Sequence, residues 1–161
     1  MDRFIEVTLR KRGVSCVARM LDDLAPKTCE AVWNALPQEG DAFHAKYASN
    51  EVFALVPPFA PTEPGMENPT ITPITGDLLY FYFPPGAVNV PSMREVAYST
   101  GLVDLAIFYG RDNLILSPNM GLVPGNRFAE VTENLEEMVE ACTSVWREGF
   151  AGERLGFRRL E

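Results

Sequence analysis

The sequence is poor in the residue types from which proteins usually build disulfide frameworks, metal centres and nucleophilic triads. It has three cysteines and a single histidine, His44, in 161 residues. An odd number of cysteines does not indicate a disulfide framework, and Cys29 and Cys142 fall on the apolar stripes of predicted helices, as small buried hydrophobic side chains do. No nucleophile elbow or Cys–His signature accompanies His44, and no spacing of Asp, Glu or Cys is typical of metal ligands. We expect no metal and no cofactor, and no catalytic residue is assigned.

Basic residues are also scarce. Lys and Arg number 14 against 22 Asp and Glu, which gives a net charge of −8 and a pI near 4.7. Because basic density supplies the affinity for nucleic acids and anionic membranes, neither is an expected partner. No apolar run approaches the ~20 residues that span a bilayer, and residues 1–7 lack the apolar region of a signal peptide. We expect a bacterial-type cytoplasmic protein.

The chain does contain enough apolar sequence for a globular core. Hydrophobic residues make up 47% and charged residues only 22%. A chain of this length buries roughly two thirds of its extended surface on folding. We predict one domain over residues 1–161, and a homodimer, because closed two-fold assemblies are the commonest among soluble proteins.

The strongest strand signal lies between Thr75 and Gly86. After Gly76-Asp77, the run from Leu78 to Phe83 is apolar or aromatic on both faces, and Pro84-Pro85 ends it. This pattern predicts a strand buried on both sides at the centre of a β-fold. Alternating or apolar patterns predict further strands at residues 4–9, 14–20, 42–47, 51–56, 102–109, 113–116, 127–131 and 153–160. The 113–116 segment is predicted to return as the hairpin partner of 102–109.

Two segments change to helical periodicity. Residues 25–36 carry an apolar stripe between Pro26, which suits a first helical turn, and Pro37, which terminates the helix. Residues 135–146 carry a continuous apolar stripe opposite three glutamates, and Gly149 closes that helix. The short segment 94–98 is ambiguous between helix and strand.

A proline-rich loop insertion interrupts the pattern at about residues 57–75. It holds six prolines in nineteen residues and has almost no periodicity. A loop of this length is longer than most passive connections in a compact domain. It is either an ordered lid over a binding site, an interface or a passive insertion, and prolines favour the ordered lid because they lower the entropy cost of holding one shape.

Several motifs together resemble a known family. The order of elements and the helix start Ala25-Pro26-Lys27-Thr28 are similar to those of the cyclophilin barrel. The remaining motifs resemble the compact bacterial cyclophilin-like proteins of unknown function; they are Gly76-Asp77, Pro84-Pro85-Gly86, Phe108-Tyr109-Gly110 and Gly125-Asn126-Arg127. The resemblance implies a mainly β fold, a closed antiparallel eight-stranded barrel capped by two helices.

The chain departs from the working prolyl isomerases of that family. Where they present Phe-His-Arg on the third strand, this chain has Phe43-His44-Ala45-Lys46, with alanine in place of the arginine. The point-like ammonium of Lys46 does not replace a planar guanidinium. The family's Gln-Gly-Gly-Asp turn and its proline-pocket segment are also missing. The resemblance therefore implies that prolyl isomerase activity is absent.

The candidate ligand-binding residues come from three places in the predicted barrel. His44 and Lys46 share a face if residues 42–47 form a strand, and the pair could bind a carboxylate or phosphate, or His44 could act as a general base. Tyrosine hydroxyls in a sheet need partners, which suggests a polar-edged pocket. The full candidate set is His44, Lys46, Tyr80, Tyr82, Tyr109, Arg111 and Asn126. Solvated strand residues, barrel packing and ordinary turn residues remain the alternative explanations.

Three functions remain open from the sequence. The first is binding of a small anionic or amide-containing metabolite in a groove with the proline-rich loop as a lid. The walls of this groove are His44, Lys46, Tyr80, Tyr82 and Tyr109, with Arg111 and Asn126 at its rim. The second is a non-catalytic interaction or assembly module, in which the proline-rich loop docks a partner or a second copy of the chain. The third is weak prolyl isomerase activity.

Overall fold

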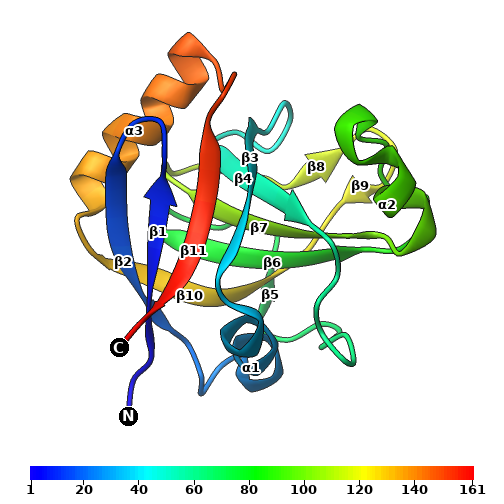
Figure 1. Ribbon diagram of the computed structural model, residues 1–161, viewed down its shortest axis with the longest axis horizontal. Coiled ribbons are helices and arrows are strands. Elements are labelled where there is room, and N and C mark those ends of the chain that lie inside the picture. Colours follow the sequence, from blue (N-terminus) through cyan, green and yellow to red (C-terminus); the bar gives the residue numbers. More distant parts are fainter.

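The computed structural model describes all 161 residues and contains a strongly curved antiparallel sheet with helices around it (Figure 1). The strands are β1 (Phe4–Leu9), β2 (Val14–Met20), β3 (Gln38–His44), β4 (Glu51–Val56), β5 (Pro69–Thr70), β6 (Asp77–Phe83), β7 (Leu102–Phe108), β8 (Leu116–Ser117), β9 (Gly121–Leu122), β10 (Gly125–Glu133) and β11 (Arg154–Leu160). The helices are α1 (Pro26–Ala35), the 3₁₀ turn η1 (Pro91–Met93), α2 (Arg94–Ser99) and α3 (Leu135–Glu148).

Eight strands close into a barrel. Their order is β2-β1-β11-β3-β4-β7-β6-β10, and a further pairing of β10 with β2 joins the two ends, while the short β5 flanks β10. All pairings are antiparallel, and the first and last strands lie in register from Phe4 opposite Leu160 to Leu9 opposite Leu155. The closed antiparallel eight-stranded barrel predicted from the sequence is confirmed. Closure leaves none of its eight strands as an open edge.

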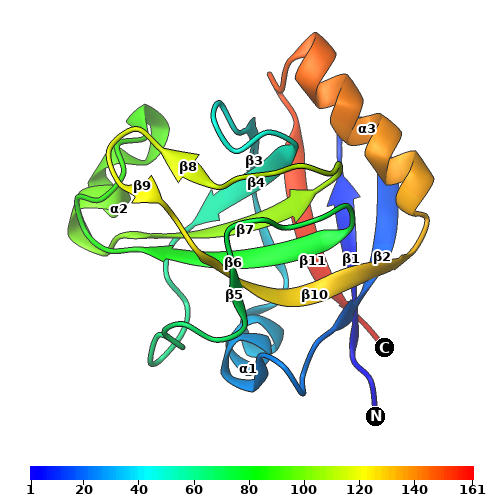
Figure 2. The same ribbon diagram turned by 180° about the vertical axis from the view of Figure 1, so that it is seen from behind.

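The interior of the barrel is the main core. A cluster of 28 buried residues combines the inward faces of the strands with Cys29 and Val32 of α1 and Met138 and Cys142 of α3. These two helices lie at opposite sides of the barrel in both views, and the chain termini lie side by side near α1 (Figures 1 and 2). The predicted central strand is β6, whose residues Asp77 to Phe81 are all buried. The two predicted helices are thus the ones that plug the barrel.

The structure resolves one segment that the sequence left ambiguous and corrects another. The ambiguous segment 94–98 lies in a third helix, α2. Only Ala97 of this helix is buried, so the sequence has no apolar stripe that would predict it. The predicted hairpin partner of β7 is absent, because β7 pairs with β4 and β6 on its two sides. The chain instead forms the small separate ribbon β8–β9 beyond it. In Figure 2 this ribbon lies beside α2 on the outside of the barrel.

The boundary of β3 also differs, and this difference bears on the candidate site. The predicted strand 42–47 begins earlier and ends at His44, so Lys46 lies in the following bend. Residues 38–41 look too polar for a strand, but they pair with β11, where Arg154 forms ion pairs with Glu39 and Asp41. Cross-strand ion pairs stabilise such polar strand positions.

All three cysteines are free and buried, as the sequence predicts for Cys29 and Cys142. Burial raises the pKa of the Cys16 and Cys29 thiols to about 12, which keeps them protonated at neutral pH. None of the helices combines the length and the apolar character needed to cross a membrane.

Candidate functional site

The strands β4 and β7 carry different chemistry on their two faces. On β4, Val52 and Ala54 belong to the barrel core, whereas Glu51, Phe53 and Leu55 point outward under β8–β9 and α2. Neighbouring residues of a strand point to opposite faces of the sheet. The same alternation on β7 puts one acidic residue, Asp104, on the outer face. The outer face is therefore partly polar, although it is covered.

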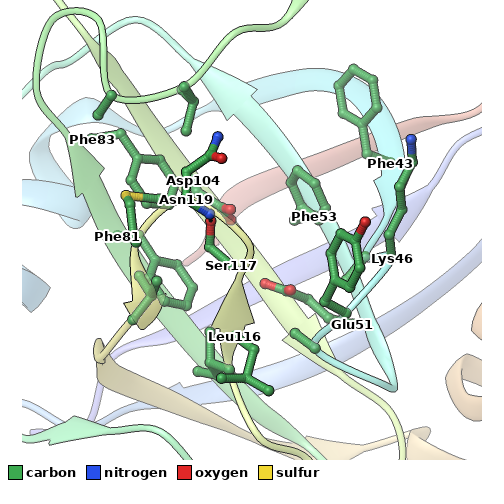
Figure 3. A pocket seen from close by; sticks show the side chains of 18 of the residues that line it. Phe43, Lys46, Glu51, Phe53, Phe81, Phe83, Asp104, Leu116, Ser117 and Asn119 are labelled. Atoms are coloured by element: carbon green, nitrogen blue, oxygen red, sulfur yellow. Dashed lines mark hydrogen bonds between the residues drawn. The ribbon is translucent and has the colours of Figure 1, made fainter.

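A cavity of about 320 Å³ lies on this outer face. Its floor is formed by strands of the barrel, and its walls by the loop before α2 and by the β8–β9 ribbon. We call it the outer cavity; its lining includes Phe43, Ala45, Lys46, Tyr47, Glu51, Phe53, Phe81, Phe83, Asn89, Asp104, Ser117, Asn119 and Met120. Figure 3 shows the Glu51 carboxyl pointing into the space between Phe81 and Phe83 on one side and Phe43 and Phe53 on the other. The cavity therefore combines aromatic walls with a carboxyl.

Glu51 and Asp104 are the buried charged groups of the outer cavity. Only 5% of Glu51 and 6% of Asp104 is exposed, and the Oδ1 atom of Asp104 has no hydrogen-bond partner. Burial raises the pKa of Glu51 to about 8. Burial, together with the nearby charge of Glu51, raises the pKa of Asp104 well above its usual range. The two carboxyls repel each other when both are ionised, so the pair retains a proton at neutral pH.

This carboxyl pair can accept hydrogen bonds or hold a cation. A buried acceptor without a partner is uncommon in folded proteins, and its cost is removed when a bound group donates to it. Lys46 lines the same cavity but forms no ion pair with either carboxyl, and in Figure 3 it extends away from Glu51 at the rim. No group of three or more His, Cys, Asp or Glu side chains is arranged to hold a metal ion.

His44 lies on the core side of the barrel, next to α3. Its Nδ1 atom is 2.8 Å from the carbonyl oxygen of Ala45, and its Nε2 atom is 2.6 Å from the hydroxyl oxygen of Tyr109. A carbonyl can only accept, so Nδ1 carries the proton, and Nε2 accepts from the Tyr109 hydroxyl. The Trp146 ring packs against the imidazole with its centroid 5.0 Å away. His44 and Tyr109 are thus brought together as predicted for one pocket, but they satisfy each other.

His44 is held neutral by its surroundings. Burial lowers the pKa of the imidazole from 6.5, and the hydrogen bond to Ala45 opposes this only in part. A group whose pKa is lower in the folded state stabilises the protein at pH values above its unfolded-state pKa. This stabilisation is lost as the pH falls through the folded-state pKa. His44 therefore contributes stability at neutral pH, and this stability is lost below pH 6.5.

We expect the fluorescence of Trp146 to report this titration. An imidazolium in ring contact with an indole quenches its emission, so acidification will reduce the fluorescence with a midpoint below 6.5. The measurement is a pH titration of a Trp33→Phe variant, which leaves Trp146 as the only tryptophan. His44→Gln in the same background will abolish the transition. A midpoint above 6.5 in the parent would contradict the buried neutral imidazole.

Three further candidates, Tyr80, Tyr82 and Asn126, line a second cavity of about 290 Å³ beneath the proline-rich loop. Tyr80 is buried and its hydroxyl donates to Glu63 of that loop, whereas Tyr82 is 36% exposed. The polar atoms of Asn126 are all engaged, because Oδ1 accepts from the Glu67 amide and Nδ2 donates to Gly65 and Thr28. The proline-rich loop is therefore fastened to the barrel and forms one wall of this cavity.

The seven candidates do not share one groove. The expectation that His44 and Lys46 lie on the same strand face is wrong, because β3 ends at His44. Arg111 is exposed in the turn after β7 and lines neither of the two cavities. Sequence reasoning missed Glu51 and Asp104. The available signal was an acidic residue within the otherwise apolar run Leu102–Phe108, since a charge in a doubly buried strand needs a reason.

Comparison with known proteins places the chain in a family. The model of a family described as a protein of unknown function, DUF3830, matches residues 7–157. The chain belongs to this family. The match includes every residue of both cavities, so the outer cavity of this DUF3830 member lies within the region that defines the family. No curated protein matches the sequence.

A solved structure described as McbB in complex with tryptophan has the same fold as this DUF3830 member. The two superpose with a TM-score of 0.67 at 18% sequence identity. The match covers 96% of this chain and 44% of that chain, so this chain spans less than half the length of the McbB chain. At this level of identity the likeness establishes the barrel fold and not the ligand.

Proposed function

We propose that this protein binds a small ligand in the outer cavity, and that the ligand carries an amine or amide donor on an apolar body. The observation that carries the proposal is the buried, unpartnered Oδ1 of Asp104 in a cavity that Glu51 also lines. Leaving such an acceptor unpaired costs about 1–3 kcal/mol, which a ligand N–H would recover. A cationic amine would in addition favour the ionised form of the carboxyls that line the cavity.

The chemistry of the lining favours a donor over an anion. The sequence left an anionic or an amide-containing metabolite open. A carboxylate or phosphate in the outer cavity would meet Glu51 and Asp104, and the ionised form of either carboxyl repels an anion in a buried site. Lys46 at the rim is exposed and offers an anion only a solvated contact. The amide half of the original expectation is therefore retained, and amines are added to it.

The aromatic walls favour an apolar body on the ligand. Phe43, Phe53, Phe81 and Phe83 line the cavity, and aromatic rings bind flat apolar groups and cations over their faces. McbB, which has the same fold, is described in complex with tryptophan, an amine with an aromatic body. This supports the ligand class by analogy of fold alone.

The same lining supports the proposal that the protein is not an active prolyl isomerase. Ala45 stands where the isomerases carry their arginine, and it lines the outer cavity. The cavity contains no arginine, and its buried charged groups are acids. In the isomerases the guanidinium of that arginine donates to the prolyl amide nitrogen, and no guanidinium is available in this cavity.

The test compares three indoles that differ in one group. We expect tryptamine and indoleacetamide to raise the melting temperature, while indoleacetate does not, and titration calorimetry will give the affinities. Asp104→Asn and Glu51→Gln will each weaken tryptamine binding about tenfold or more, as expected when a hydrogen bond to a charged group is lost. Glu133→Gln, on the exposed end of β10, is the matched control for lost charge and will leave binding unchanged.

Two results would contradict the proposal. Equal affinities for indoleacetate and tryptamine would show that the carboxyl pair does not select the ligand. Absence of any binding, together with a dimeric mass in light scattering that is lost when residues 63–68 are deleted, would instead support the interaction module. Exposed apolar residues near the cavity, Leu116 and Leu122 among them, are the observation in favour of that second function and of a homodimer.

A further inference from the structure

The second cavity adjoins the outer cavity. The two share a wall made of Phe81 and Phe83 of β6 and of Met120 and Val123 around β9. This wall is apolar throughout, whereas each cavity has a carboxyl in its lining. The polar groups are Glu51 and Asp104 on one side of the wall and Glu63 on the other.

Glu63 carries a free acceptor in the second cavity. The Tyr80 hydroxyl donates to Oε1, but Oε2 is buried and has no hydrogen-bond partner. Burial raises the pKa of this carboxyl, and the bond from Tyr80 opposes the change only in part. Glu63 therefore has the same property as Asp104, a covered carboxyl oxygen that no group of the chain satisfies.

The loop segment that carries Glu63 is fixed in place. The Asn126 side chain accepts from the Glu67 amide at 2.8 Å and donates to the Gly65 carbonyl at 2.7 Å. Phe59, earlier in the same loop, packs against the Tyr80 ring at 6.0 Å between centroids. A ligand that reaches Glu63 thus finds its acceptor already positioned, which lowers the entropy cost of binding.

We propose that the two cavities hold the two ends of one elongated ligand, with an N–H donor at each end and an apolar chain between them. One end donates to the free Oδ1 of Asp104 in the cavity that Glu51 also lines, the apolar middle lies along the residues that the two cavities share, and the other end donates to Glu63. Diamines of the alkane series and longer polyamines belong to this ligand class. The acidic net charge of −8 attracts such cations to the protein. This inference rests on the proposed function of the outer cavity and extends it.

The experiment compares alkane monoamines with diamines of equal chain length, from diaminobutane to diaminodecane, by titration calorimetry. Above the length that spans the wall, we expect the diamine to bind about tenfold more tightly than the matched monoamine, because a second charged hydrogen bond is formed. Glu63→Gln will remove this gain and leave the monoamine affinity unchanged. The amide oxygen of the substituted side chain can still accept from Tyr80, so the loop keeps its anchor.

Glu67→Gln is the matched control. Glu67 lies in the same loop and accepts from the Lys27 and Thr28 amides, but it does not line the second cavity. We expect this variant to keep the diamine gain. If Glu63→Gln and Glu67→Gln lose the diamine gain equally, the gain comes from long-range electrostatic attraction, and the inference is overturned.

The result also separates this inference from the proposed function. Monoamine binding that depends on Glu51, with no gain for any diamine, overturns the elongated ligand and leaves the outer cavity intact. If neither series binds, the elongated ligand is overturned, and the outer-cavity proposal is overturned as well only if tryptamine also fails to bind.

Discussion

The free energy of unfolding will fall as the pH rises from 4.5 to about 8, because burial raises the pKa of the Glu51 carboxyl across this range. The folded state holds a proton that the unfolded state has released. This stabilisation is complete below the unfolded-state pKa and is lost as the pH rises through the folded-state pKa. Each additional proton on the folded state changes the free energy by about 1.4 kcal/mol per pH unit. Urea denaturation at a series of pH values measures the slope.

Substitution will show which groups cause the slope. Glu51→Gln and Asp104→Asn are neutral at every pH, so each will flatten the profile and gain stability relative to the parent as the pH rises. Glu133→Gln, which is exposed, will keep the parent slope. His44 acts in the opposite direction below pH 6.5, and comparison of variants at the same pH removes its contribution. A parent slope that persists in Glu51→Gln would contradict the buried-carboxyl explanation.

Gly101→Ala will destabilise the protein by about 3 kcal/mol or more, the sum of backbone strain and overpacking. Gly101 joins α2 to β7 with φ +79°, and a Cβ atom there would lie 2.2 Å from the Phe83 carbonyl oxygen and 3.0 Å from the Pro84 carbonyl carbon. Backbone atoms at the end of β6 cannot move aside without disturbing the sheet. The shift of the urea midpoint measures the loss.

Gly13→Ala separates the two causes. Gly13 has φ +65° in the turn between β1 and β2, but a Cβ atom there would meet nothing within 4 Å. The free energy of unfolding of this variant will fall only by the about 1–2 kcal/mol that a left-handed backbone costs an alanine. Equal losses at both positions would mean that the contact with Phe83 is relieved by a local shift, against the prediction.

The elements that the sequence predicted correctly are those whose pattern reflects burial. The apolar run after Gly76 became β6, and the stripe opposite Glu136 became α3, because each packs an entire face into the barrel. Elements with few buried residues were missed or misplaced. In α2 only Ala97 is buried, and in residues 38–41 of β3 the pairing with β11 and its ion pairs take the place of an apolar face.

The candidate site was harder to predict for a related reason. His44 drew attention as the only histidine, but its partners Tyr109 and Trp146 are 65 and 102 residues away in sequence, and they make it part of the packing. Asp104 and Glu51 lie on neighbouring strands, and their proximity depends on the pairing of β4 with β7. A single sequence without that register gives no sign that two separate acids share a cavity.

The alternation of faces along β7 has a consequence for how such a barrel diversifies. Val103 and Leu105 face the interior, while Asp104 between them faces the outer cavity, so a single strand serves two independent purposes. Inward-facing and outward-facing positions can therefore be under separate selection. The inward positions are constrained by the volume of the core, and the outward positions can change with the ligand. A barrel built in this way can change its binding chemistry one outward residue at a time while its interior stays the same.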